Sequence, residues 1–501
     1  MFKRSDQARV FACPPGADFP KALVAGLLER AQPYPPEYLA RAEVFVNTRR
    51  MHRRISRLFD DGPARLLPQI RLITELAHDP AGHDLAPAVS PLRRRLQLCQ
   101  LVARLLDKEP DLAPRSAIFD LADSLALLLG EMQDEAVSPD RIRALDVADR
   151  SGHWPRRQMF LHIVGRSFGD AGGEPPDISA RQRRVTAHMI RGWERQPPAH
   201  PIIVAGSTGS RGSTAMLMHA VASLPQGAIV LPGFDFDLPP TVWAKLNDAL
   251  TAEDHPQFRL ARILDATGTA PQDVRLWHPG AVPPTPARNR LISLALRPAP
   301  ATDQWMQEGP DLKGIDDAAR HMSLIEAPSE RAEAVAIALA LREAAELGKT
   351  AALVTPDRLL TRQVTAALDR WRIVPDVSAG DALDHTPPGR LLRHVAELFG
   401  RTLTSEALLV LLKHPLVNAG PGRGQHLSFT RELELKIRRD GPPYPGSSDI
   451  LDWAAKDTAD RARMVWAKCV NDTVLGQHDI AERSLSRHLE HLIRFANALV
   501  A

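Results

Sequence analysis

One stretch constrains the fold more than any other: residues 201–238, PIIVAGSTGSRGSTAMLMHAVASLPQGAIVLPGFDFDL. It holds a short apolar run over 201–205, a loop of small residues, an apolar-periodic segment over 215–224 and a second apolar run over 228–231. This pattern predicts a buried strand, a glycine-containing turn, a helix and another strand. Such a βαβ unit indicates an α/β fold, with a parallel sheet covered by helices. Ligands of such sheets bind where strands end and helices begin, which is where this loop would lie.

The loop between the predicted strand and helix has the pattern Gly206-x-x-Gly209-x-x-Gly212. Its backbone amides could cradle a phosphate group, and its hydroxyl side chains add further donors. The candidate phosphate-contacting residues are Gly206, Ser207, Thr208, Gly209 and Ser210. Because no Gly-Lys-Ser/Thr closes the loop, it is not a Walker A motif. The alternative interpretation is a tight strand-to-helix turn with a serine or threonine cap.

Composition limits the classes of protein to consider. A chain of 501 residues with 44% hydrophobic and 25% charged residues is typical of an ordinary globular protein of about three domains. The net charge of +3 is too small to indicate nucleic-acid binding, so any anion site must be local. Three cysteines without a CxxC pair argue against a disulfide framework and against a structural zinc or iron–sulfur site. Without a leader-like or membrane-length apolar run, we expect a soluble cytoplasmic protein.

The first predicted βα turn resembles a nucleotide site that has lost its chemistry. A strand over 9–13, a turn containing Gly16 and an amphipathic helix stand where a P-loop ATPase holds its phosphates. Lys21 is present, but no glycine precedes it, and Ala22 occupies the place of the magnesium-binding Ser or Thr. Gly16 and Lys21 therefore belong to a degenerate nucleotide site, or the turn is only a first βα unit. Either interpretation favours a protein without ATPase activity.

A basic helix is predicted directly after the strand over 43–47, and a further strand and turn over 66–74. Arginines recur in this helix at spacings of three and four, so several share one face. Such a face could follow a phosphate backbone, although a solvated helix surface is the common alternative. The candidate DNA-contacting residues of this helix are Arg49, Arg53 and Arg54.

Helical patterns occupy two long parts of the chain. The first, over 91–199, has helices predicted at 91–107, 116–134, 138–149, 153–166 and 179–195. It interrupts an α/β domain made of 1–90 and 200–310, so we interpret it as an inserted subdomain. The second, over 387–501, has helices predicted at 388–399, 404–412, 429–439, 448–469 and 479–500. Its last apolar helix runs to the chain end, which suggests a piece of a longer protein.

A second α/β domain is predicted over 315–386. Strands at 321–326 and 351–354 each precede a helix, at 330–347 and 357–370 respectively. Thr355 and Arg358 follow the second strand, where they could meet a phosphate. The alternative is that Thr355 or Asp357 only caps the helix.

Several stretches, in one order along the chain, resemble AddB, the second subunit of AddAB-type helicase–nucleases. They are PPGADFPKALVAGL at 14–27, LLPQIRLI at 66–73, the segment 204–235, HPQF at 255–258, ERAEAVAIALALREA at 330–344, the segment 349–371 and LLKHPL at 411–416. The resemblance implies two superfamily 1 helicase-like α/β domains with large helical insertions. It also implies a role beside the AddA motor subunit in processing double-strand DNA break ends for homologous recombination repair.

The chain departs from an active helicase in two places. The turn with Gly16 and Lys21 lacks a Walker A motif, which fits a branch of the family whose helicase half does not hydrolyse ATP. The loop Gly206–Ser210 lies about where an active helicase carries a Gly-Asp and Gln coupling motif, and those residues are missing. The family's nuclease domain, with its iron–sulfur cluster and magnesium, lies outside these residues. We therefore expect no catalytic residue, metal or cofactor in this chain.

Three functions follow from these patterns. The leading hypothesis is an inactivated-helicase module, nucleoid-associated and without a membrane partner, that holds and scans single-stranded DNA beside AddA. Its DNA contacts would be Arg49, Arg53 and Arg54, the loop Gly206–Ser210, and Thr355 with Arg358. The alternatives are a DNA-stimulated ATPase with a divergent P-loop that uses Lys21, and a scaffold for AddA without DNA contact.

Overall fold

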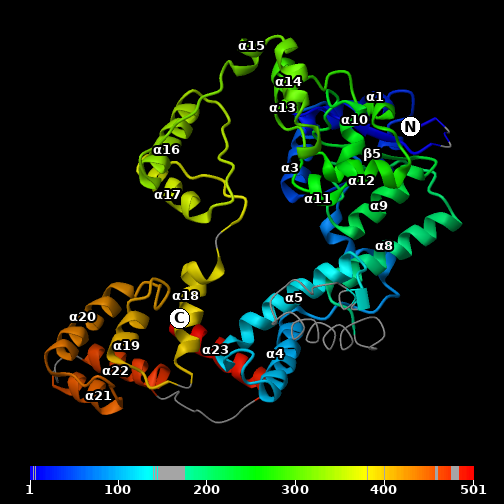
Figure 1. Cartoon of the computed structure of the whole chain (residues 1–501). Coiled ribbons are helices and arrows are strands. Elements are labelled where there is room, and N and C mark those ends of the chain that lie inside the picture. The colour runs from blue at the N-terminus through cyan, green and yellow to red at the C-terminus, as the bar shows by residue number, and fades with distance from the viewer. Residues whose placement is uncertain are drawn as a thin grey trace. The chain divides into compact units, whose positions relative to one another are not determined.

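The fold is known from a computed structural model, shown in Figure 1. The structure describes residues 1–138 except 4 and 6, residues 140, 141 and 144, and residues 175–500 except 381, 400, 457–460 and 476–483. The predicted helix at 153–166 and most of the one at 138–149 lie outside this part of the chain. Two compact units are present, Met1–Ser323 (unit 1) and Leu324–Ala501 (unit 2).

Unit 1 is built on a six-stranded parallel sheet with the strand order β3-β2-β4-β5-β1-β6. The strands are β1 Val10–Ala12, β2 Glu43–Val46, β3 Gln69–Leu72, β4 Ile202–Ala205, β5 Gly227–Leu231 and β6 Arg275–Leu276. The α/β prediction is confirmed for this unit, and each of the first five strands lies where its apolar run predicted it. The sixth was missed because two exposed residues in a proline-rich stretch leave no apolar pattern.

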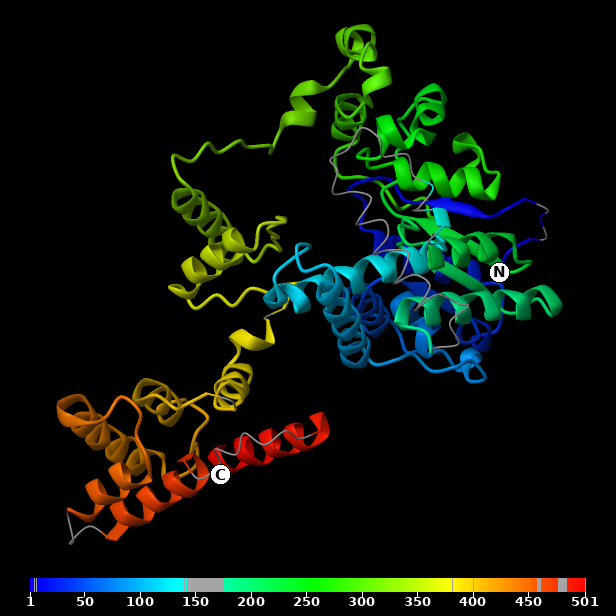
Figure 2. The same cartoon turned by 60° about the horizontal axis from the view of Figure 1, so that its bottom comes forward.

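Helices cover both faces of the sheet (Figure 2). One face carries α1 (Phe19–Ala31), α2 (Glu37–Ala40) and α3 (Arg49–Asp60). The other carries α8 (Ile178–Arg195), α9 (Gly212–Ser223), α10 (Pro240–Trp243) and α12 (Phe258–Thr267). Along β2, Phe45 packs on the α9 side while Val44 and Val46 pack on the α1 side. Because the central strands are buried on both faces, nearly all of their residues are apolar, which gives continuous apolar runs in the sequence.

The described residues after β3 hold two helices of the predicted inserted block that pack on each other. Helices α4 (Pro91–Lys108) and α5 (Ile118–Asp134) pack on each other around Leu98 and Leu125. Helix α8, however, places Val185 and Met189 in the core of the sheet. It therefore packs on the sheet, although the predicted insertion over 91–199 included it. Further short helices of unit 1 are α11 (Ala249–Ala252), α13 (Pro286–Ala295), α14 (Gln304–Glu308) and α15 (Ile315–Ala319).

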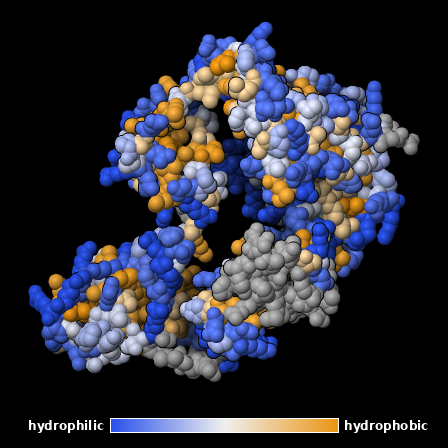
Figure 3. Space-filling model, in the orientation of Figure 1, coloured by the Kyte–Doolittle hydropathy of each residue, from blue (hydrophilic) through white to orange (hydrophobic). Residues whose placement is uncertain are grey.

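Unit 2 begins with α16 (Glu330–Glu346) and α17 (Arg358–Asp369), which pack through Ala338 and Val364. Both helices were predicted, but the strands predicted at 321–326 and 351–354 are wrong, since none of the described residues of unit 2 forms a strand. These segments have no ladder partner, so their apolar side chains stay in solvent: Leu324 is 87% and Val354 94% exposed. Figure 3 shows hydrophobic side chains at the surface over α16 and α17.

The rest of unit 2 is helical, as predicted. Its helices are α18 (Pro387–Glu397), α19 (Ser405–Leu412), α20 (Arg423–Asp440), α21 (Ser447–Ala455), α22 (Arg461–Thr473) and α23 (Leu485–Val500). The single helix predicted over 448–469 is thus two helices, α21 and α22. The helices α18 to α23 share one apolar core around Phe429, Trp453 and Trp466. Across the described ranges of both units, none of the helices combines the length and the apolar character that a membrane span needs.

A buried histidine makes unit 2 sensitive to acid. In α20, His426 Nε2 donates to the Leu412 carbonyl (2.7 Å), and its Nδ1 accepts from the Trp466 indole (3.0 Å). Protonating Nδ1 would set two donors against each other, and burial lowers the pKa of His426 below its usual range. The unfolded chain therefore binds the proton first, so stability is complete above the ordinary histidine pKa and falls as the pH drops below it.

We expect the free energy of unfolding to fall as the pH drops from about 7 to about 5, by no more than about 1.4 kcal/mol per pH unit for each such histidine. The urea midpoint of the chain should fall with it. A His426→Gln variant keeps a donor and an acceptor but does not titrate. It should show a shallower pH dependence, whereas replacing the exposed His385 should not. Equal slopes in the wild type and the His426→Gln variant would contradict this assignment.

Candidate nucleic-acid interface

Four loops gather at the carboxyl edge of the sheet in unit 1. They follow β1, β2, β4 and β5, which are neighbours in the order β2-β4-β5-β1. The chain leaves β2 toward α3 on one face and β4 toward α9 on the other. Adjacent strands whose connections leave to opposite faces open a crevice between them, where α/β sheets bind ligands. This edge is therefore the place to look for a site.

The loop after β4 lies at Gly206 against the first turns of α1 and α3, the helices that follow β1 and β2. A Cβ at this position would lie 3.2 Å from the Phe19 ring of α1 and 3.3 Å from the Met51 methyl group of α3. The residue also has φ +75°, a conformation that favours glycine. The structure thus brings the predicted loop at 206–210 beside the starts of the two helices that carry Lys21 and Arg49.

Helix α3 presents a basic face at this edge. At 100° per residue, its five arginines fall within an arc of about 140°, while Ile55 and Phe59 point into the core. All five arginines are exposed: Arg49, Arg50, Arg53, Arg54 and Arg57. The Thr48 hydroxyl caps the helix by accepting from the Met51 amide (3.1 Å). The predicted clustering of the arginines on one face is confirmed.

The arginines of this face differ in their partners. Arg49 lies 2.8 Å from Glu75, and Arg54 lies 3.7 Å from Asp18, all four side chains being about half exposed or more. Arg53 and Arg57 form no ion pair with any residue in the described part of the chain. Exposed ion pairs contribute little stability, so the carboxylates can exchange for other anions at small cost. The face is therefore available to an anionic polymer.

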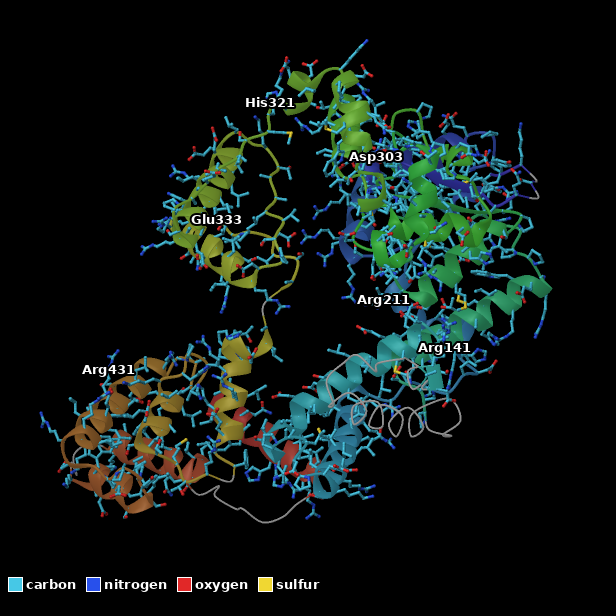
Figure 4. All side chains as sticks on the ribbon, in the orientation of Figure 1. Arg141, Arg211, Asp303, His321, Glu333 and Arg431 are labelled. Carbon is cyan, nitrogen blue, oxygen red and sulfur yellow. The ribbon has the colours of Figure 1, made fainter. Side chains whose placement is uncertain are left out.

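The glycine loop is partly closed as an anion site. The Ser207 hydroxyl is buried and accepts from the Gly209 amide (3.2 Å), an internal turn bond. At the start of α9, the Gly212 amide donates to Glu135 (2.8 Å) and the Ser213 amide to Asp134 (3.3 Å). Figure 4 labels Arg211 at this junction. Because carboxylates already hold the amides of Gly212 and Ser213, a phosphate here would have to be held by other groups of the described loop, such as Thr208, Ser210 and Arg211.

The residues that cap α9 were not predicted from the sequence. Asp134 and Glu135 close the end of α5, and the Asp134 carboxylate also accepts from the Ser213 hydroxyl (2.5 Å). The sequence analysis allowed a serine or threonine cap here, but in the structure the N-cap residue is Arg211, whose side chain cannot accept a backbone hydrogen bond. A helix start without a local acceptor needs one from elsewhere.

Replacing Asp134 with alanine is expected to lower the unfolding free energy by about 1–3 kcal/mol, because it leaves the buried Ser213 without its acceptor. Urea unfolding followed by circular dichroism measures the loss. The exposed Glu131, on the same helix, provides the matched control through Glu131→Ala. Equal losses in both variants would contradict a capping role for Asp134.

The first βα turn holds a carboxylate where a P-loop holds phosphate. Gly16 is exposed at φ +80°, and Asp18 caps α1 by accepting from the Lys21 amide (3.2 Å). The Lys21 side chain is exposed. A helix N-terminus favours one anion, and here the protein supplies it from its own chain. Asp18 thus occupies the helix start at which an anion would bind, and the degenerate nucleotide site at Gly16 and Lys21 stays a prediction.

The turn after β5 is acidic and limits the basic surface. Gln257 holds this turn by accepting from the Asp235 amide (3.1 Å) and donating to the Gly233 carbonyl (2.9 Å). Burial and then the Asp235 carboxylate raise the pKa of Asp237, against the opposing effect of Arg290 and Arg297. Carboxylates repel phosphates, so this turn is unfavourable for an anion.

The two candidates in unit 2 lie at the start of α17. The Thr355 hydroxyl accepts from the Asp357 amide (3.1 Å), and Asp357 caps the helix by accepting from the Leu359 amide (2.7 Å). Arg358 is the first residue of the helix and is exposed. The capping alternative thus describes the local geometry, and phosphate contact by Thr355 and Arg358 stays a prediction.

Among the described residues, no three His, Cys, Asp or Glu side chains form a group that could hold a metal ion. Comparison with protein-family models and with curated proteins gives no match for this chain. The structure by itself defines an architecture. Unit 1 is a three-layer α/β unit, and the described residues of unit 2 are helical. The resemblance to AddB stays a prediction.

Proposed function

We propose that this chain is a DNA-binding, inactivated-helicase module of the AddB type, which holds single-stranded DNA beside an AddA motor subunit during the processing of double-strand break ends. One observation carries the proposal. The exposed arginine face of α3 begins directly where β2 ends, at the edge of a parallel sheet where such folds bind ligands.

The physical basis of binding would be phosphate contact. An arc of about 140° on a helix of 12 residues can meet successive phosphates of an extended strand. Arg53 and Arg57 would contact phosphates directly, and Arg49 and Arg54 would exchange Glu75 and Asp18 for them. The Thr208 and Ser210 side chains of the β4 loop add hydroxyl donors on the neighbouring strand end.

The start of α1 supports a module without ATP hydrolysis. A nucleotide in the P-loop position would face the Asp18 carboxylate, which already accepts from the Lys21 amide. A second anion at the helix N-terminus that Asp18 already occupies would be repelled by this carboxylate. No hydroxyl follows Lys21 to hold magnesium, because the next residue is Ala22, whose side chain is buried in the α1 core.

The decisive experiment measures single-stranded DNA binding by the whole chain across a salt series, with ATP hydrolysis followed in the same tubes. We expect affinity to fall with salt by about 0.7 log units per log unit for each phosphate contact, and no DNA-stimulated hydrolysis. Hydrolysis that is lost in a Lys21→Ala variant would replace the proposal with a divergent ATPase. Absence of both activities, with AddA binding retained, would replace it with a scaffold.

A further inference from the structure

A polar pocket of about 940 Å³ opens at the opposite, amino edge of the same sheet. It lies where β1 and β6 begin and where α12 ends. Its described lining includes Lys3, Arg9, Phe11, Arg30, Thr269 and Arg275. No sequence motif pointed to it, because these residues are dispersed along the first 275 positions of the chain.

Three guanidinium groups converge on this pocket. Arg9 is only 3% exposed, and it donates to the carbonyls of Leu224 (2.8 Å) and Lys3 (2.7 Å). Arg30 donates to the carbonyls of Gly26 (3.0 Å) and Trp277 (2.7 Å). Arg275 is exposed, and it shares the Phe11 ring with Arg30, at 4.9 and 5.1 Å from the centroid. Neutral carbonyls position the arginines without cancelling their charge.

In the described part of the chain, little negative charge faces this cluster of arginines. Within the described ranges, none of the three arginines forms an ion pair, and Asp273 is the one carboxylate that lines the pocket. Burial, and then Arg275, lower the pKa of Arg9. Burial also lowers the pKa of Arg30, with Glu29 opposing and Arg275 adding to the effect. Uncompensated buried charge is costly, which favours a bound counter-anion.

Ring stacking alone does not account for the arrangement. It explains Arg30, whose guanidinium lies 3.9 Å from the centroid of the Trp277 ring. It does not explain Arg9, which is buried and lies 6.0 Å from the Phe2 ring. An arginine with a purely structural role would be expected to pair with a carboxylate. The charged group that acts on Arg9 is instead a second cation, Arg275.

We infer that this pocket binds a small phosphate ester, with Arg275, Arg30 and Arg9 holding the phosphoryl oxygens. Guanidinium groups match phosphate oxygens in paired hydrogen bonds. Thr269 and Gln272 line the same pocket with neutral donors and acceptors suited to a sugar or base. The volume is within the range of about 300–1,000 Å³ for small-molecule sites. The site is independent of the DNA interface, which lies at the other edge of the sheet.

Titration calorimetry of the whole chain with pyrophosphate tests this inference. We expect saturable binding of one pyrophosphate per chain, weakened about tenfold or more in an Arg275→Gln variant. Arg275 is exposed, so this variant should fold. Arg262→Gln is the matched control, since Arg262 is also exposed and lies 5.9 Å from the centroid of a phenylalanine ring. Absence of saturable binding, or equal binding by both variants, would overturn the inference.

Competition with bound pyrophosphate identifies the source of the phosphate. A trinucleotide with a 5′-phosphate that competes, while its 5′-hydroxyl form does not, would assign the pocket to nucleic-acid ends. Competition by a nucleoside monophosphate but by neither trinucleotide would assign it to free phosphate esters. Charge reversal of Arg53 and Arg54 should leave pyrophosphate binding unchanged, and a parallel loss would overturn the independence of the two sites.

Discussion

Reversing the charge of Arg53 and Arg54 to glutamate is expected to weaken single-stranded DNA binding about ten- to hundredfold at low salt. Both side chains are exposed on the basic face of α3. The double substitution changes the charge of that face by four units and introduces repulsion where attraction is proposed. Fluorescence anisotropy with a labelled oligonucleotide measures the effect.

Salt dependence distinguishes lost phosphate contacts from general damage. Removing two contacts should reduce the slope of log affinity against log salt by about 1.4, since each contact to a single strand contributes about 0.7. A misfolded variant would instead lose affinity together with its cooperative melting transition. The single Arg53→Glu variant separates the two further, because it leaves the 3.7 Å pair between Arg54 and Asp18 in place.

The matched control is charge reversal on a helix of the opposite sheet face. Arg259 and Arg262 are exposed on α12, and reversing both changes the net charge by the same amount. If binding depends on the α3 face, the α12 variant should bind nearly as well as the wild type. Wild-type affinity in the Arg53/Arg54 variant would contradict the basic-face proposal. Equal losses in both variants would show that the net charge of the chain, rather than the α3 face, determines binding.

The sheet of unit 1 could be predicted because its central strands are buried on both faces. Apolar runs such as 202–205 and 227–231 leave few alternatives when a glycine turn and an amphipathic helix separate them. The edge strand β6, which has two exposed residues, lacks this pattern, whereas β3 at the other edge keeps it. The predicted strands at 321–326 and 351–354 show the converse. Their apolar composition is that of strands, but composition alone does not provide a pairing partner.

The candidate interface could be predicted only in its local parts. The arginine face of α3 follows from helical spacing, which the sequence displays directly. The caps of α9 do not, because Glu135 and Asp134 are separated by 77 and 79 residues from the amides that they accept from. Because of these contacts, the amides at the start of α9 already donate to carboxylates of the protein, although the loop sequence resembles a phosphate-binding loop. The arginines of the pocket at the amino edge likewise come together only in the folded chain, so the sequence does not show them as a group.

Replacing Trp277 with alanine is expected to lower the unfolding free energy of unit 1 by about 3–5 kcal/mol. Trp277 is 1% exposed and joins the end of β6 to α1. Its indole donates to the Leu23 carbonyl (3.2 Å), meets Phe11 edge-on at 5.3 Å and supports the Arg30 guanidinium. Leu23 and Leu27 are buried beside it in the α1 core, so we expect much of the space to remain a cavity. Urea unfolding followed by circular dichroism measures the loss.

A substitution at Gly26 tests the same contact from the other side. A Cβ there would lie 2.3 Å from the indole nitrogen of Trp277 and 2.7 Å from Cε2, closer than real contacts allow. Gly26→Ala should therefore cost about 1–3 kcal/mol in the wild type, although alanine favours a helix by about 1 kcal/mol over glycine. In the Trp277→Ala background the clash is absent, so the same substitution should be neutral or stabilising. Additive losses in the double variant would show that Gly26 and Trp277 do not pack against each other.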